Sequence, residues 1–134
     1  MSFALINSNR LSLLAILLVM SSCTLFESDI VCTSSLVFGI GVEVTDSQTG
    51  EKVSDLWAFA NDGAYADSFY VEPSSDGPAL LAPERPGTYQ VFVTKDGYQP
   101  WLSANVKVVE DQHGCHVEPV RLNARLERAS SAEG

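Results

Sequence analysis

Hydrophobic and polar residues alternate along most of the chain beyond about residue 36, which is the pattern of half-buried β-strands. The first clear case is Ile40, Val42 and Val44, which are separated by small or polar residues. Further strands are predicted at about 52–60, 79–82, 88–95, 102–108 and 115–127, with two short strands pairing within 64–71. We therefore predict an all-β fold, a two-sheet antiparallel sandwich of about seven strands over residues 36–127, with a disordered tail at 128–134.

The same alternation assigns side chains to the two faces of each strand, because successive residues point to opposite sides of a sheet. The positions expected to face the core are Val53, Leu56, Ala58, Ala60, Tyr89, Val91, Val93, Leu102, Ala104, Val106, Val108, Val120, Leu122, Ala124 and Leu126. Trp57 and Phe59 are expected on the opposite face of their strand. Tyr89 carries a hydroxyl that we expect to reach the backbone at a strand corner.

A continuous apolar run occupies residues 11–20, after a segment with one base, Arg10, and no acid. The run is about half as long as the roughly 20 residues that a membrane-spanning helix needs. It therefore predicts a signal peptide over residues 1–22 rather than a permanent membrane anchor. A buried core helix is the alternative.

The segment Met20-Ser21-Ser22-Cys23 resembles the lipobox of bacterial lipoproteins. This resemblance implies that Cys23 carries acyl chains such as palmitate and becomes the mature N-terminus, with residues 23–35 as a tether. Cleavage after Ser22 without lipidation is the alternative. Thr24 stands where an aspartate would favour inner-membrane retention, so the resemblance implies a cell-envelope protein anchored in the outer membrane and facing the periplasm.

Charge limits the classes of partner. The chain has 17 acidic and 8 basic residues, and losing Arg10 with the signal peptide leaves 7 bases and a net charge of −10. Nucleic acid is therefore not expected as a partner, because its phosphates require an excess of Lys and Arg. An anionic membrane surface would also repel the domain, so its expected contact with the membrane is the lipid on Cys23.

The chain has three cysteines, and two of them, Cys32 and Cys115, remain once Cys23 is assigned to lipid. The oxidising environment of an exported protein favours a disulfide between these two. Free buried thiols and zinc ligation are the alternatives.

Two segments resemble the carboxypeptidase regulatory-like domains, which have a transthyretin-like (prealbumin-like) sandwich. These are Gly87–Tyr98, with its Tyr-x-Val-x-Val strand followed by Gly-Tyr, and Val42–Gly50, with its Thr-Gly turn. The resemblance covers roughly residues 38–126. It implies an accessory, folding or binding module rather than an enzyme.

The strongest candidate for chemistry is the cluster Asp111-x-His113-x-Cys115-His116, whose residue types suit zinc or a thiol nucleophile. Adjacent residues of a strand point to opposite faces, however, and Cys115 is expected to pair with Cys32. We therefore expect no catalytic residue, metal or other cofactor. A metal-dependent or hydrolytic enzyme using His113 or His116 is kept as an alternative.

The remaining candidate site is aromatic. Trp57, Tyr98 and Trp101 form a possible ligand patch, since exposed rings stack on sugars or peptides and anchor interfaces. Packing of these rings against the core is the alternative. The sequence thus favours a non-enzymatic binding or scaffolding module whose partner is an envelope protein or glycan, with a structural subunit of an envelope complex as the second possibility.

Overall fold

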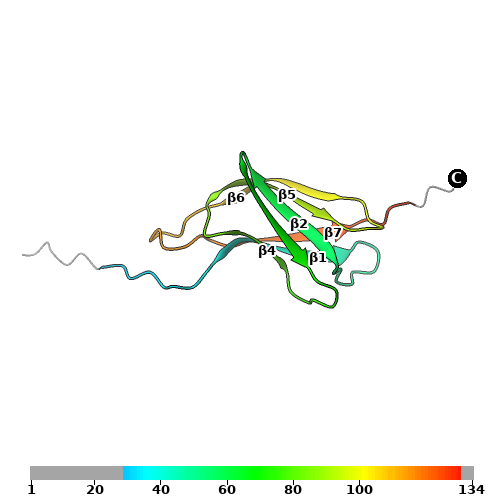
Figure 1. The fold of residues 1–134 in the computed structure, drawn as a ribbon, viewed down its shortest axis with the longest axis horizontal. Helices are drawn as coiled ribbons and strands as arrows, with labels where there is room; N and C mark the ends of the chain where they lie inside the picture. Colours follow the sequence, from blue (N-terminus) through cyan, green and yellow to red (C-terminus); the bar gives the residue numbers. More distant parts are fainter. Residues whose placement is uncertain (1–28, 131–134) are drawn as a thin grey trace, which may run out of the picture. The chain divides into compact units, whose positions relative to one another are not determined.

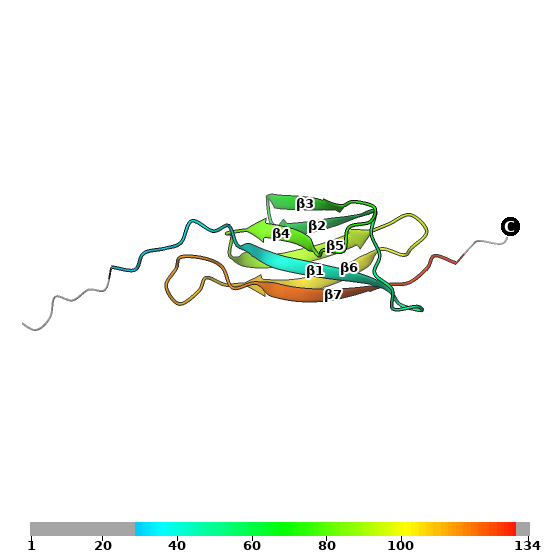
Figure 2. The same cartoon turned by 90° about the horizontal axis from the view of Figure 1, so that it is seen from below.

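The fold was analysed in a computed structural model that describes residues 29–130, and its compact domain begins at Cys32. The predicted signal peptide and Cys23 lie outside the described residues. Within residues 29–130 there is no helix that could span a membrane. Figures 1 and 2 show that this part of the chain is built from β-strands and loops.

Seven strands form two sheets, as predicted. They are β1 (Phe38–Asp46), β2 (Leu56–Asp62), β3 (Tyr65–Val71), β4 (Ala79–Pro83), β5 (Gly87–Thr94), β6 (Trp101–Val108) and β7 (Val120–Leu126). One sheet has the order β4-β1-β7 and the other β3-β2-β5-β6, and in Figure 2 the strands of each sheet follow one another in this order. The predicted two-sheet sandwich is therefore confirmed.

One strand pair departs from the antiparallel arrangement that we predicted for the whole sandwich. β1 and β7 run parallel, from the pair Ile40 and Val120 to the pair Asp46 and Leu126, whereas the other neighbouring strands are antiparallel. Parallel neighbours need a long connection. Here the other five strands lie between β1 and β7 in the sequence and provide it.

The core lies between the sheets and follows the predicted alternation in β1, β2, β5 and β7. The largest fully buried side chains are Tyr89, Ile40, Leu56, Leu81, Leu126, Val42, Val91, Val93 and Val108. Tyr89 also makes the predicted contact with the backbone at a strand corner. Its hydroxyl donates a hydrogen bond of 2.8 Å to the carbonyl of Arg85. A Cβ on Gly87 in this corner would lie 2.5 Å from Asp62 Oδ2, so a larger residue there would displace the Asp62 side chain from Arg85.

The predicted inward face of β6 is wrong in its first half. Val106 and Val108 are buried, but Leu102 and Ala104 are exposed, while Trp101 and Ser103 are half-buried. A bulge causes this change, since the register shifts between Tyr89 and Val91 of β5, and Asn105 takes a positive φ of 58°. An extra residue in a strand reverses the faces of all positions on one side of it.

The segment predicted as two short strands within 64–71 is one continuous strand, β3. Tyr65, Phe69 and Val71 face inward with Asp67, whose acidic side chain concealed the alternation. The Asp67 carboxylate accepts a hydrogen bond of 2.8 Å from the amide of Ala82 in β4. Asp67 therefore links the edge strands of the two sheets.

Paired structure also extends two residues past the predicted end of the domain. Arg128, which we placed in the tail, forms a β-bridge with Tyr98, and the amide of Ala129 donates to the carbonyl of Gly97 over 2.9 Å. The rest of the predicted tail beyond Ser130 lies outside the described residues.

Candidate functional site

The outer surface of the four-stranded sheet carries an uncovered apolar cluster. It consists of Trp57 and Phe59 on β2, Tyr70 on β3, Phe92 on β5 and Leu102 on β6, and we call these five residues the aromatic face. Strand pairing brings them together, because Trp57 lies opposite Tyr70, Phe59 lies opposite Phe92, and Phe92 lies opposite Leu102. Paired residues share one side of a sheet, so the five side chains cross all four strands.

The aromatic face is open to solvent. Trp57 is 46% exposed, Tyr70 37% and Leu102 55%, whereas Phe59 and Phe92 are half-buried between them. The ring centroids of Trp57 and Tyr70 lie 5.1 Å apart, and those of Trp57 and Phe59 lie 6.0 Å apart with nearly parallel planes. Such contacts between rings keep the exposed side chains in defined positions.

Charge is almost absent from the outer surface of this sheet. The outward positions around the aromatic face are Asn61, Ala66, Ser68, Thr88, Gln90, Thr94, Ala104 and Lys107. Among the outward positions of these four strands, Lys107 is the one charged residue, and it lies next to the bulge, opposite Thr88. The acidic residues of the domain are therefore placed elsewhere, and this surface offers rings surrounded by neutral hydroxyl and amide groups.

A network of polar contacts holds the end of the aromatic face that contains Trp57. The hydroxyl of Tyr70 donates to Asp55 Oδ1 over 2.5 Å, and Lys95 Nζ donates to the Asp55 carbonyl over 2.9 Å. The bond from Tyr70, followed by the charge of Lys95, lowers the pKa of Asp55, and the same bond raises the pKa of Tyr70. Trp57 lines a hollow of about 410 Å³ together with Tyr70, Lys95 and Tyr98.

The predicted ligand patch of Trp57, Tyr98 and Trp101 is only partly brought together. Trp57 is exposed, and Tyr98 lines the same hollow, but Tyr98 and Trp101 both pack against the hydrophobic core. The contributions of Tyr70, Phe92 and Leu102 were not predicted from the sequence. The alternation that placed Trp57 and Phe59 outward was a usable signal, whereas the bulge in β6 concealed Leu102.

Tyr98 has a structural partner at the end of the sandwich. Its hydroxyl donates to Asp46 Oδ2 over 2.8 Å, and Arg128 Nε donates to the same atom over 2.8 Å. Asp46 Oδ1 accepts from the amides of Gln48 and Thr49 over 2.8 and 3.1 Å. The Thr49 amide, then Tyr98 and Arg128, hold the pKa of Asp46 well below its usual range.

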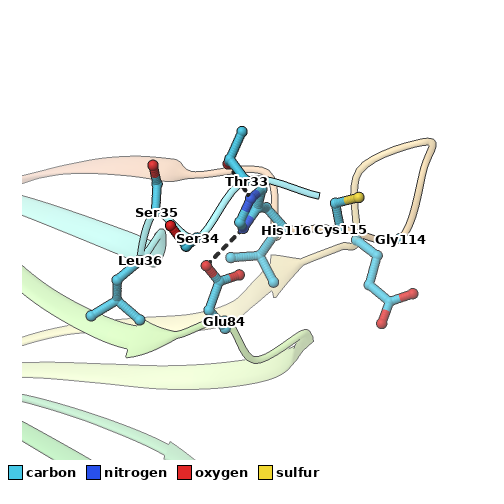
Figure 3. Close-up of a pocket in the computed structure, with 10 residues that line it drawn as sticks. Thr33, Ser34, Ser35, Leu36, Glu84, Gly114, Cys115 and His116 are labelled. Atoms are coloured by element: carbon cyan, nitrogen blue, oxygen red, sulfur yellow. Dashed lines mark hydrogen bonds and ion pairs between the residues drawn. The ribbon is translucent and has the colours of Figure 1, made fainter. Parts of the chain in front are cut away.

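A second candidate site lies where the chain enters the domain, around His116 (Figure 3). His116 Nδ1 lies 2.8 Å from Glu84 Oε1, and His116 Nε2 lies 2.9 Å from the hydroxyl of Thr33. Because a carboxylate only accepts hydrogen bonds, His116 Nδ1 is the donor to Glu84. These residues line a pocket of about 380 Å³.

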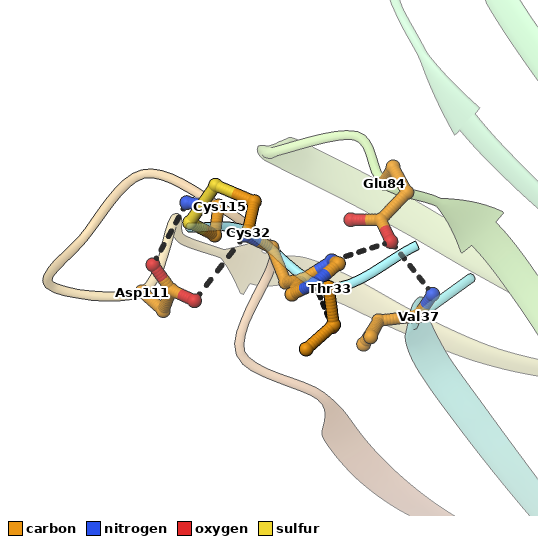
Figure 4. A network of polar contacts seen from close by, with 7 residues as sticks. Cys32, Thr33, Val37, Glu84, Asp111 and Cys115 are labelled. Atoms are coloured by element: carbon orange, nitrogen blue, oxygen red, sulfur yellow. Dashed lines mark hydrogen bonds and ion pairs between the residues drawn. A yellow bond between two sulfur atoms is a disulfide. The ribbon is translucent and has the colours of Figure 1, made fainter. Parts of the chain in front are cut away.

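A hydroxyl, an imidazole and a carboxylate in this order also form the catalytic triad of serine hydrolases. In this domain the three groups connect three segments of the chain. Glu84 Oε1 also accepts from the amide of Val37 over 2.7 Å (Figure 4). The Val37 amide, and then His116, lower the pKa of Glu84. The network thus fastens residues 33–37 to the β4–β5 turn and to the β6–β7 loop.

The predicted disulfide between Cys32 and Cys115 is present, with 5.3 Å between the Cα atoms. Asp111 shapes the loop that carries Cys115, since its carboxylate accepts from the amides of His113, Cys115 and His116 over 3.0 to 3.2 Å. Burial raises the pKa of Asp111, but the amides of Cys115, His113 and His116 outweigh burial and leave it lowered. The alternatives of free thiols and of zinc on Cys115 are thereby overturned.

His113 does not join the pocket around His116. Its Nε2 contacts Gln112 Nε2 over 3.0 Å on the exposed loop, and it is not among the residues that line the pocket. Within residues 29–130 no three His, Cys, Asp or Glu side chains are grouped so as to hold a metal ion.

A third feature is an apolar groove on the outer surface of the three-stranded sheet. It has a volume of about 660 Å³, and its lining includes Leu36, Phe38 and Leu80 together with the charged residues Glu43 and Arg121. Gly41 forms part of the floor, and its lack of a side chain deepens the groove. This surface corresponds to the apolar sheet face that a structural subunit would present.

Comparison with known proteins adds no assignment to these sites. The sequence matches no protein-family model, and no curated protein matches it.

Proposed function

We propose that this protein is a lipid-anchored, non-enzymatic binding module of the cell envelope that binds its partner through the aromatic face. The observation that carries the proposal is the cluster of Trp57, Phe59, Tyr70, Phe92 and Leu102 on an almost uncharged sheet surface. Exposed apolar area is unfavourable in water by about 25 cal/mol per Å². A contiguous patch of this kind on a small, otherwise acidic domain is typical of a binding site.

The arrangement of the domain suits anchoring at one end and binding at the other. The tether enters beside Phe38 at the start of β1, whereas Trp57 pairs with Thr94 just before the turn that contains Tyr98. Tyr98 is hydrogen-bonded to Asp46 at the far end of β1. Under the proposed lipidation of Cys23, the Trp57 end of the aromatic face therefore lies at the opposite end of β1 from the point where the tether joins the domain.

The proposed anchor rests on the resemblance of residues 20–23 to a lipobox and on the apolar run before it. Mass spectrometry of the protein purified from membranes tests this part directly. A mature N-terminal peptide that begins at Cys23 and carries acyl mass is the expected result. An unmodified N-terminus would contradict the anchor without affecting the proposed binding surface.

Oxidative footprinting tests the binding surface without knowledge of the ligand. Trp57 and Trp101 are the two tryptophans of the chain and provide a matched pair, because one lies on the aromatic face and the other packs against the core. We expect Trp57 to be oxidised in the purified domain and protected in native envelopes, with Trp101 changing little. Equal oxidation of Trp57 in both preparations would contradict binding through the aromatic face.

A further inference from the structure

We infer that the ligand of the aromatic face is an uncharged polysaccharide chain. This inference rests on the proposed function and adds the chemical class of its ligand. Sugar rings present flat C–H surfaces that pack on aromatic side chains, and their edges carry hydroxyl groups. A surface that binds them needs rings in a line with neutral hydrogen-bonding groups beside it.

The dimensions of the aromatic face suit an extended chain. Tyr70 lies on one edge strand, β3, and Leu102 on the other, β6, with Trp57, Phe59 and Phe92 between them. Three strand spacings separate the two ends, which is about 14 Å. The face therefore offers a row of apolar side chains for several consecutive sugars rather than a closed pocket for one.

Neutral polar side chains lie beside the row. Ser68 is the strand partner of Phe59, Thr94 is the strand partner of Trp57, and Gln90 is the neighbour of Phe92 two positions away on β5. All three are exposed. Their hydroxyl and amide groups can both donate and accept hydrogen bonds, as sugar hydroxyls do.

Charge argues for an uncharged polysaccharide over an acidic one. Lys107 is the one base among the outward positions of the four strands, and Lys95 at the margin is engaged with Asp55 at 3.6 Å. The protein without its signal peptide has a net charge of −10. Carboxylated or sulfated chains would therefore meet repulsion without a cluster of bases to offset it.

Area argues against a protein partner. Four strands of about seven residues cover roughly 440 Å² of sheet surface. A stable protein interface buries about 800 Å² on each partner. A protein partner would therefore also contact the charged residues around the uncharged surface, whereas a single polysaccharide chain can be accommodated on it.

The test uses residues 23–134 with Trp101→Phe, so that Trp57 is the sole tryptophan and its fluorescence reports on the aromatic face. The probes are four neutral oligosaccharides, namely maltoheptaose, cellohexaose, chitohexaose and laminarihexaose, and one acidic control, oligogalacturonate. We expect at least one neutral probe to shift the emission and to bind equally at about 50 and about 500 mM NaCl, because no ion pair is involved. Oligogalacturonate is expected not to bind.

Variants assign the binding to the surface. Isothermal titration calorimetry with Trp57→Ala should show a loss of affinity of about tenfold or more. Phe38→Ala, on the outer surface of the other sheet, serves as the matched control and should bind normally, and circular dichroism checks that each variant is folded. Binding that persists in Trp57→Ala, or stronger binding of oligogalacturonate, would overturn the inference.

The experiments distinguish a wrong ligand class from a wrong binding surface. If none of the neutral probes binds but Trp57 is protected in native envelopes, the polysaccharide inference is overturned and the binding surface stands. A photoreactive residue at position 92 that crosslinks to a protein in envelopes would likewise overturn the polysaccharide and leave the binding surface in place. If the probes fail and Trp57 is also unprotected, both proposals are overturned.

Discussion

The hydroxyl of Tyr98 donates a hydrogen bond to the carboxylate of Asp46, a group that is only 2% exposed. This bond, with those from Arg128 and the Thr49 amide, ties the β5–β6 turn and the C-terminal segment to the end of β1. Tyr98→Phe removes one donor from a charged acceptor. We expect its melting temperature to fall by roughly 6 to 12 °C, because a hydrogen bond to a charged group contributes about 1.5 kcal/mol or more and a domain of this size loses about 4 to 8 °C per kcal/mol. An unchanged melting temperature would contradict the structural role of this hydroxyl.

The Asp46 contacts also predict how stability depends on pH. They hold the pKa of Asp46 below its usual range in the folded protein, so folding favours the ionised carboxylate. The stabilisation is complete above the ordinary aspartate pKa of about 4 and is lost as the pH falls further, because the unfolded chain then binds the proton first. Urea unfolding between about pH 6 and about pH 2.5 measures it. Asp46→Asn should be less stable at pH 6 and should show a shallower loss in acid.

The disulfide predicts a large effect of reduction. Cys32 and Cys115 are 83 positions apart, and closing a loop of this length contributes about 4 to 5 kcal/mol in the chain-entropy model. The double variant Cys32→Ser and Cys115→Ser should therefore unfold at a much lower urea concentration than the oxidised protein. Adding dithiothreitol should lower the midpoint of the wild type but not that of the double variant. Equal midpoints for oxidised and reduced protein would contradict this prediction.

The network of Thr33, His116 and Glu84 is expected to act in structure rather than in hydrolysis. Wild type, Thr33→Ala and His116→Ala should hydrolyse p-nitrophenyl butyrate equally slowly, while hydrogen exchange at residues 33–37 should accelerate in both variants. His113→Ala is the matched control, since His113 lies outside the pocket. Hydrolysis that disappears in Thr33→Ala and His116→Ala but survives in His113→Ala would establish the enzymatic alternative instead.

The bulge in β6 predicts opposite outcomes for two substitutions at one position. Asn105 has a φ of 58°, a left-handed conformation that glycine adopts freely and that a β-branched residue adopts at a cost. Asn105→Gly should retain the free energy of unfolding to within about 0.5 kcal/mol, whereas Asn105→Val should lose about 1 to 2 kcal/mol. Thermal and urea unfolding measure both. If valine were tolerated as well as glycine, the bulge would lie elsewhere.

The sequence was sufficient for those parts of the fold in which one physical signal acts alone. Uninterrupted alternation placed Ile40, Val42 and Val44 in the core, and the even number of remaining cysteines identified the pairing of Cys32 with Cys115. Prediction from the sequence failed where a local irregularity interrupts the alternation of inward and outward positions along a strand. One additional residue at Asn105 turned Leu102 outward, and one inward acid, Asp67, concealed a continuous strand.

The candidate site was harder to predict because it depends on which strands are neighbours. Trp57 and Phe59 were correctly placed opposite the core side of their strand, but their contacts with Tyr70 and Phe92 arise only from the order β3-β2-β5-β6. Alternation within a strand carries no information about that order. The predicted disulfide between Cys32 and Cys115 indicates that the adjacent residues Thr33 and His116 lie close together, but nothing in the sequence placed Glu84 beside them.

The disulfide has a mechanical consequence under the proposed attachment of the domain to a lipid at one end and to a ligand at the other. Tension arriving through the tether divides at Cys32. One part passes along residues 33–37 into β1, and the other crosses to Cys115, in the loop between β6 and β7, and reaches the N-terminal end of β7 as well as the C-terminal end of β6. β1 and β7 are parallel neighbours, so both are pulled from their N-terminal ends in the same direction. The load therefore does not slide one strand past the other, and the hydrogen bonds between them are spared.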